Sequence, residues 1–219
     1  MAMFRIIDQI DIGHEGPVAN WQNGEHQLIH LAQGSMDGAC GPYSLMMALI
    51  ICGLIDREDL VSLRKVDGRT SAGKLLNALQ EYQGFFRDGT HLEDLSELLE
   101  KSYPKHLDVV PCIASGIEVR KFVKEHVDNN HPVILSLDYG DDDGHWVLAI
   151  GYEYETNNQI YEEYEPIRFL ILDPDKSAPV FSAWNGIVDA RGTGGRYPYV
   201  WWGKDYKVNF TAALALCPK

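Results

Sequence analysis

The chain has 219 residues, 45% of them hydrophobic, which is enough for a sizeable core and predicts a single domain over residues 1–219. Its formal net charge of −13 excludes binding to nucleic acid or anionic membranes by bulk electrostatics. The same charge favours basic substrates or partners.

The spacing of the cysteines and the sorting signals indicate the cellular compartment in which the protein works. The four cysteines, Cys40, Cys52, Cys112 and Cys217, are widely spaced and form no C-x-x-C pair. We therefore expect no zinc site and no disulfide framework. We expect the last three cysteines to be small buried hydrophobic residues. No signal peptide is recognisable, and the longest apolar run, residues 45–51, is too short to span a bilayer. These features predict a cytoplasmic location, or delivery by a route without a cleaved signal.

A glycine-rich loop that runs into an apolar helix, at residues 33–53, is the most informative stretch. Cys40 stands at the predicted start of the helix, and every residue at 45–51 is apolar, so the helix should be buried all round. The positive end of the helix dipole favours a thiolate at Cys40. Gln33 can place an amide donor beside this thiol. A cysteine with an amide donor is half of an acyl-transfer site, in which the amide stabilises the oxyanion.

Residues from about 35 to 130 are predicted to be largely helical. After the central helix, Asp56 and Ser71 can cap the next two helices. Thr90 and Glu93 form a T-x-x-E capping box for a third helix, and a fourth is expected from Gly116.

Residues from about 131 to 219 change to a strand pattern. Buried strands are predicted to form an antiparallel sheet, at 132–137, 145–155, 167–172, 197–202 and 207–216. The strand character is weaker at 4–12 and 106–114. The polar segment 156–166 is expected to be a long hairpin loop, and the glycine-rich segment 186–198 a mobile surface loop. A helical part followed by a strand part predicts the α+β class.

His145 and Asp173 are expected to meet at one edge of this sheet. His145 opens a predicted strand directly after Gly144, and Asp173 ends the next strand, where Pro174 stops the ladder. If the two strands pair antiparallel, the start of one lies beside the end of the other. The Asp173 carboxylate can then accept the imidazole N–H, fix its tautomer and stabilise the imidazolium. The imidazole would face Cys40.

Four patches in this order resemble the papain-like cysteine peptidases, and are closest to the C39-like branch, the relatives of bacteriocin-processing peptidases. The patches are Gln33, Cys-Gly-Pro-x-Ser-Leu from Cys40, Gly-His-Trp-Val-Leu-Ala-Ile-Gly-Tyr from Gly144, and Leu-Asp-Pro from Leu172.

The resemblance implies a role for each candidate residue. Cys40 would be the nucleophile, His145 the base and then the acid, Asp173 the residue that orients the histidine, and Gln33 the oxyanion-hole donor. The resemblance also implies a papain-like fold, in which a helical lobe carrying the nucleophile helix packs against an antiparallel sheet.

The implied activity is cleavage of an amide bond in a peptide or protein, without a metal or organic cofactor. The order Cys-His-Asp does not separate a bacterial peptidase from an amidase, a glutamine deamidase or a transglutaminase-like acyltransferase that acts as a toxin or effector. A papain-like module kept as a binding domain is the non-enzymatic alternative. Among partners, we expect a basic peptide or protein substrate and leave open an inhibitor or immunity protein.

Three further features bear on access to the site. Asp141, Asp142 and Asp143 are interpreted as a solvated acidic turn, with an acidic rim that selects basic substrates as the functional alternative. Trp184 follows Asp173 in a loop and is a candidate for the cleft wall. Residues 1–32 could lie over the cleft, and their three histidines are expected to be ordinary surface or partly buried residues.

Overall fold

A computed structural model of the chain describes residues 1–21, 23–34, 38–61, 66–81, 89–114, 116–140, 143–156, 164–192, 196–201 and 204–219. Its helices are α1 (Cys40–Ile51), α2 (Arg57–Val61), α3 (Ser71–Glu81), α4 (Leu92–Ser102) and α5 (Gly116–Asp128). All residues of α1 except Tyr43 are buried, as the uninterrupted apolar run predicted. Among the described residues, no helix combines the length and the apolar character needed to cross a membrane.

The caps of α2 and α3 lie close to their predicted positions. Asp56 directly precedes α2, and its carbonyl accepts the Asp59 N–H at 3.1 Å. For α3 the prediction is off by one residue, because the cap is Thr70 and not Ser71. The Thr70 hydroxyl accepts the Gly73 N–H at 3.0 Å, which is the usual bond of a helix N-cap.

The capping box of α4 is also displaced by one residue. The cap is His91, whose backbone N–H donates to the Asp94 carboxylate at 3.0 Å, instead of the predicted pair Thr90 and Glu93. The displacement has a physical reason, because Thr90 is buried and its carbonyl accepts the indole N–H of Trp146 at 2.8 Å. Tertiary packing thus takes Thr90 inward and leaves the next residue to cap the helix.

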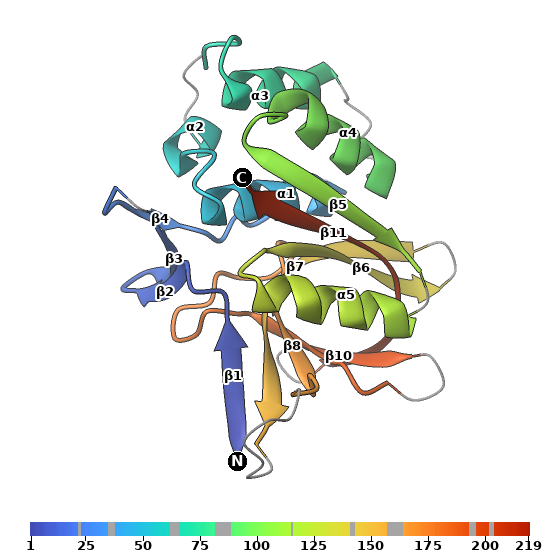
Figure 1. The fold of residues 1–219 in the computed structure, drawn as a ribbon. Helices are drawn as coiled ribbons and strands as arrows, with labels where there is room; N and C mark the ends of the chain where they lie inside the picture. Colours follow the sequence, from blue (N-terminus) through green and yellow to red (C-terminus); the bar gives the residue numbers. More distant parts are fainter. Residues whose placement is uncertain are drawn as a thin grey trace.

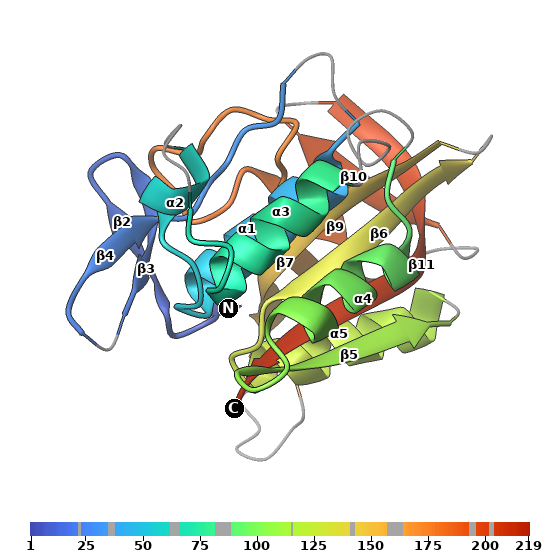
Figure 2. The same cartoon turned by 90° about the horizontal axis from the view of Figure 1, so that it is seen from above.

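The strands form two sheets among the described residues. The small sheet contains β2 (Ile10–Gly13), β3 (Gly16–Asn20) and β4 (His26–Leu28), and it lies apart from the main sheet at the left of Figures 1 and 2. The eight-stranded sheet contains β1 (Ala2–Ile6), β5 (Leu107–Ile113), β6 (Val133–Gly140), β7 (Asp143–Glu155), β8 (Arg168–Leu172), β9 (Gly186–Asp189), β10 (Tyr197–Trp201) and β11 (Lys204–Pro218).

Six strands of the larger sheet close into a barrel-like ring, which the sequence did not predict. The ring runs β7-β6-β11-β10-β9-β8 and returns to β7, because β8 pairs with both β9 and β7. Closure depends on β9, which lies in the segment 186–198 that the glycine pattern predicted to be a loop. That prediction was wrong for 186–189, whereas 197–198 begin β10, as the overlapping strand prediction for 197–202 had placed them. Residues 193–195 lie outside the described residues, as does most of the predicted hairpin loop, 157–163.

Strands from the N-terminal part of the chain also join this sheet. β1 pairs with the second half of β7, with Ala2 opposite Glu155, and β5 pairs with β11, with Leu107 opposite Pro218. The helical and strand parts are therefore less separate along the chain than the boundary near residue 130 suggested.

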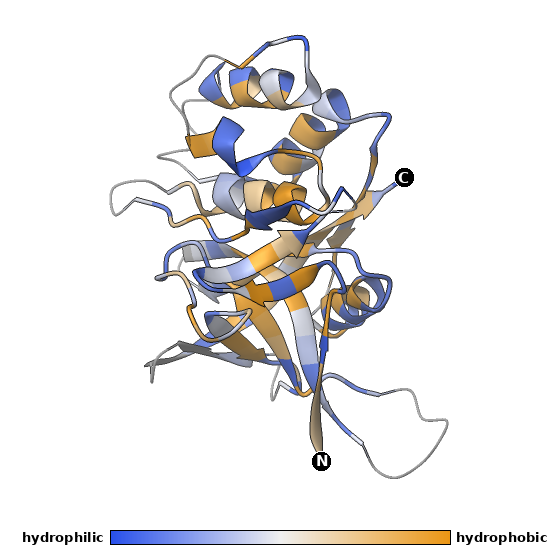
Figure 3. Ribbon diagram, turned by 90° about the vertical axis from the view of Figure 1, so that its left-hand side faces the viewer, coloured by the Kyte–Doolittle hydropathy of each residue, from blue (hydrophilic) through white to orange (hydrophobic). Residues whose placement is uncertain are grey.

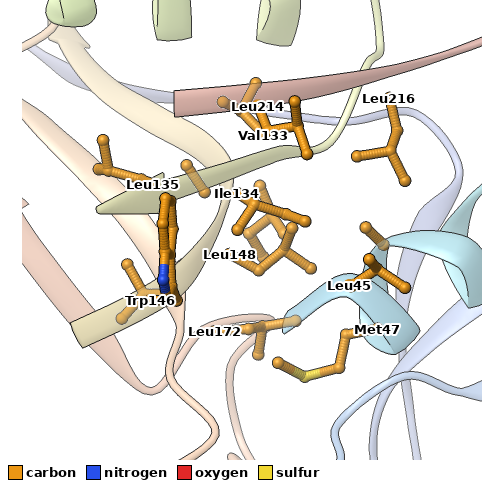
Figure 4. Packing of buried hydrophobic residues seen from close by; sticks show 14 of the residues in the cluster. Leu45, Met47, Val133, Ile134, Leu135, Trp146, Leu148, Leu172, Leu214 and Leu216 are labelled. Atoms are coloured by element: carbon orange, nitrogen blue, oxygen red, sulfur yellow. The ribbon is translucent and has the colours of Figure 1, made fainter. Parts of the chain in front are cut away.

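The helices cover this sheet and position the start of α1 against it. α1 packs on β6 and β7, α4 packs on β5 and β11, and α5 packs mainly on β11 (Figure 2). Leu45 and Met47 of α1 face Leu148 of β7 and Leu172 of β8 in the core (Figure 4). The hydropathy colouring shows hydrophobic residues concentrated where α1 meets the sheet (Figure 3). This packing fixes the first residue of α1 at the edge of the sheet.

Candidate active site

The start of β7 and the end of β8 bring His145 and Asp173 together. The two strands pair antiparallel, with Leu148 opposite Leu172, so the predicted pairing is confirmed. His145 Nε2 lies 2.7 Å from Asp173 Oδ1. Asp173 is fully buried, and water therefore does not compete for this hydrogen bond.

Cys40, the first residue of α1, lines the same groove as His145. The Cys40 side chain is one of the groups that raise the pKa of the imidazole. Because Asp173 engages Nε2, the nitrogen available to the thiol is Nδ1. The backbone N–H of Trp146 also donates to Cys40 Sγ at 3.4 Å, and the Ser44 hydroxyl donates to the Trp146 carbonyl at 3.1 Å. These bonds tie the start of β7 directly to α1.

The charges of this group favour an imidazolium beside a carboxylate. Burial lowers the pKa of His145, but hydrogen bonds and charges from Asp173 and Cys40 outweigh burial and raise this pKa to about 10. For Asp173, burial raises the pKa, whereas hydrogen bonds from His145 and Tyr199 and the charge of His145 bring it below its usual value. At neutral pH His145 is therefore protonated and Asp173 is ionised.

Asp173 has further partners that the sequence analysis missed. The Tyr199 hydroxyl donates to its Oδ2, and the Asp175 N–H donates to its Oδ1 at 2.9 Å. The backbone N–H of Asp173 donates to Asn185 Oδ1 at 2.7 Å. Tyr199 lies on β10 and Asn185 lies just before β9, and the pairing of β9 with β8 and with β10 brings both residues to Asp173. No local sequence signal marks either residue.

His30 belongs to the same buried network, contrary to the expectation of an ordinary histidine. Its Nε2 lies 3.1 Å from the Asp173 carbonyl. Asn185 Nδ2 lies 2.9 Å from that carbonyl and 3.2 Å from the Ser177 carbonyl, which accounts for both amide hydrogens. His30 therefore carries its proton on Nε2 and donates it to Asp173. Burial lowers the pKa of His30, in keeping with a neutral ring.

A groove of about 650 Å³ opens over Cys40 and His145. Its walls include residues 89–93, which lead into the first turn of α4, and side chains from β5, β6 and β11. Gln33 lies in the same wall, and its backbone N–H donates to the Pro174 carbonyl at 2.8 Å. Gln33 Oε1 is buried, and no described residue is its hydrogen-bond partner. The structure thus brings Gln33, Cys40, His145 and Asp173 to one site.

Close packing explains the glycine that follows Cys40. A Cβ on Gly41 would lie 3.0 Å from both Cβ and Oγ1 of Thr90 and 3.3 Å from Cδ1 of Trp146. A side chain at this position would push the start of α1 away from the groove wall. The glycine therefore sets how closely Cys40 approaches β7.

Some residues that were expected to line or cover the groove are not among the described residues that line it. Trp184 does not line the groove, because its ring packs against Phe4 with 5.4 Å between ring centroids. Of the described residues before Gln33, none lines the groove, so the small N-terminal sheet does not cover it. Asp141 and Asp142 lie outside the described residues, and nothing is described of the side chain of Asp143.

The three remaining cysteines also differ from expectation. Cys52, Cys112 and Cys217 are half-buried instead of fully buried, and all three are free thiols.

A thiol at the start of a buried helix, facing a histidine on an antiparallel sheet, is the arrangement of the papain-like class. The family model described as the Peptidase_C39 like family matches residues 17–179. The chain belongs to this family, and thereby to the papain-like cysteine peptidases.

The chain is also similar to a solved structure of low sequence identity. The crystal structure of UfSP from C. elegans is similar, with 15% sequence identity and a TM-score of 0.48 over 99% of this chain and 34% of that chain. This chain thus spans about a third of the UfSP chain. No curated protein matches it.

Proposed function

We propose that the protein hydrolyses an amide bond in a peptide or protein, with Cys40 as the nucleophile, His145 as base and then acid, and Asp173 as the residue that orients the imidazole. The observation that carries the proposal is the hydrogen bond between His145 Nε2 and Asp173 Oδ1 in a groove that Cys40 also lines, with the Trp146 N–H holding Cys40 Sγ at the start of β7. Each neighbour of the histidine favours its charged form.

The proposed reaction begins with attack of the Cys40 sulfur on the substrate carbonyl carbon. The carbonyl oxygen becomes an oxyanion, which the Gln33 side-chain amide and the Cys40 backbone N–H would stabilise. His145 gives its proton to the leaving nitrogen as the C–N bond breaks, and an acyl-enzyme remains. His145 then takes a proton from water as the water oxygen attacks the thioester carbon. The C–S bond breaks, which releases the carboxylic acid and restores the Cys40 thiolate beside the imidazolium.

Two features of the chain support attack by a thiolate. α1 begins at Cys40, so its unpaired N–H groups and the positive end of its dipole lie next to the sulfur. The Trp146 N–H adds a further hydrogen-bond donor to the sulfur. The imidazolium of His145 supplies the positive charge that the thiolate requires.

The groove favours substrates that are basic or apolar. Among the described residues that line it, Glu93 is the carboxylate and none is a lysine or arginine. Ile113 lies at the groove with 70% of its surface exposed, which offers an apolar contact. The net charge of −13 adds a general attraction for basic peptides.

The first experiment is alkylation of the thiols with iodoacetamide from pH 4 to 9, with mass spectrometry to locate the label. We expect Cys40 to react rapidly at pH 5–6 in the native protein and slowly in His145→Ala, because the imidazolium no longer stabilises the thiolate. Cys112, which is half-buried, is the internal control. Equal labelling of Cys40 and Cys112 at pH 6 would contradict the proposed ion pair and favour a binding module.

A second experiment identifies the reaction. Incubation with a library of basic peptides should yield new amino termini that disappear in Cys40→Ala. Release of ammonia without chain cleavage would assign a deamidase. Incorporation of an added primary amine would assign an acyltransferase.

A further inference from the structure

Three potential metal ligands meet at the end of α5, outside the catalytic groove. They are His126 in the last turn of α5, His131 in the turn that follows, and Cys217 near the end of β11. His126 Nδ1 lies 3.3 Å from His131 Nδ1 and 3.7 Å from Cys217 Sγ. All three ligand atoms lie within 4.8 Å of one another, and no other such group of three occurs among the described residues. We propose that His126, His131 and Cys217 form a zinc-binding site.

The distances between these atoms suit tetrahedral coordination of zinc. Zinc binds imidazole nitrogen at about 2.0–2.1 Å and thiolate sulfur at about 2.3 Å. At tetrahedral angles, two nitrogens should then be about 3.3–3.4 Å apart, and a nitrogen and a sulfur about 3.5–3.6 Å apart. The two measured distances from His126 Nδ1 match these values closely. The third edge, between His131 and Cys217, is no longer than 4.8 Å.

The backbone holds the two histidines together before any ion binds. Asn130 has a φ of 61°, its N–H donates to the Val127 carbonyl at 3.0 Å, and the His131 N–H donates to the His126 carbonyl at 2.9 Å. These two bonds around a left-handed residue define a Schellman motif, which places the residue after the turn over the last turn of the helix. The motif therefore puts His131 beside His126, with 5.5 Å between ring centroids.

Side chains from other elements fix this turn. Asn130 Oδ1 accepts hydrogen bonds from Arg5 at 2.7 Å and from the Asp8 N–H at 3.0 Å. The ring of Phe122 packs on His126, with 4.3 Å between centroids. Such support around the ligands is what a metal site requires of its surroundings.

The two kinds of ligand suit a cation with affinity for nitrogen and sulfur, because zinc is commonly bound by imidazole nitrogen and cysteine sulfur. Zinc binding would form a Zn–S bond and release the thiol proton to solvent. Water would fill the fourth coordination position.

This site would revise the expectation that the chain binds no zinc. Spacing along the sequence gave no signal, because Cys217 is 86 residues from His131 and reaches it through the β6–β11 pairing. A bound ion would link α5, the turn after it and β11. Its role would be to stabilise the fold at a place away from the groove.

The test is a titration of the EDTA-treated full chain with Zn²⁺ in competition with a chromogenic chelator. Cys40→Ala serves as the background, so that the ion cannot bind the catalytic thiol. We expect one zinc per chain, with an affinity reduced by at least about 10–100-fold in Cys217→Ser and in His131→Ala. Cys112→Ser is the matched control, because Cys112 is also a half-buried thiol on a strand next to β11, and it should bind zinc like the background.

A measurement on the unmodified chain tests the same site without depending on whether the variants fold. Bound zinc should protect Cys217 from iodoacetamide, and removal of zinc by EDTA should restore labelling. The proposal is overturned if no zinc binds, if Cys217→Ser and His131→Ala bind it as tightly as the background, or if Cys217 is labelled equally with and without zinc. In any of those cases the cluster is a hydrogen-bonded thiol–imidazole group. None of these readouts depends on peptidase activity.

Discussion

The hydroxyl of Tyr199 should contribute substantially to stability, because it donates to Asp173, a fully buried carboxylate. The substitution Tyr199→Phe removes this donor while keeping the ring, which is also buried. Asp173 would keep its bonds from His145 and Asp175 but would lose the donor to Oδ2.

The size of the effect follows from the charge and burial of the acceptor. A hydrogen bond to a charged group contributes about 1.5–3 kcal/mol, and water cannot replace it at a fully buried oxygen. We therefore expect the free energy of unfolding to fall by about 2 kcal/mol at pH 7. The pKa of Asp173 is lower in the folded protein than its usual value of 3.8, so its ionised form contributes stability above about pH 4. The difference between the two proteins should shrink as the pH falls below that value.

Urea denaturation at pH 7 and at pH 3–4, followed by tryptophan fluorescence, measures this difference. The control is Tyr197→Phe, because Tyr197 lies on the same strand and is also buried, but its ring stacks on Phe210 with 4.1 Å between centroids. A loss below about 0.5 kcal/mol in Tyr199→Phe, or an equal loss in the control, would refute the role assigned to the hydroxyl.

Three further predictions concern the groove. Gln33→Ala should lower kcat by about 10²–10³ with little change in urea denaturation, because it removes one oxyanion donor; unchanged kcat would exclude Gln33 from that role. Gly41→Ala should lower the unfolding free energy by about 1–3 kcal/mol, because its Cβ would lie 3.0 Å from Thr90; denaturation curves that coincide with those of the parent would contradict this packing. The pKa of His145 is raised from 6.5 to about 10, so its contribution to stability is complete below pH 6.5 and disappears as the pH rises toward 10. Denaturation at pH 6–10 should show this slope in the parent and lose it in His145→Gln.

The positions of the candidate catalytic residues followed from local rules. A buried apolar run placed Cys40 at a helix start, and the edge rule for antiparallel strands placed Asp173 beside His145. These rules work because a helix start and two consecutive strands are determined by nearby sequence.

The residues that support Asp173 could not be predicted in this way. Tyr199, Asn185 and His30 lie 26, 12 and 143 residues from Asp173, and no local pattern predicts any of these contacts. Closure itself was missed because β9 has only four residues and adjoins a glycine-rich segment, so local composition favoured a loop. Pairing with β8 and β10 on both sides overrides that local preference.

The place of β11 in the sheet has a consequence for synthesis of the chain. β11 follows all the other described strands in sequence, yet it pairs with β5, β6 and β10 (Figure 1). A nascent chain therefore cannot close the ring until residues 204–218 have left the ribosome. Until then β10 lacks its main partner, and Tyr199 has no fixed position from which to reach Asp173. The topology thus delays assembly of the candidate active site until β11 has been synthesised.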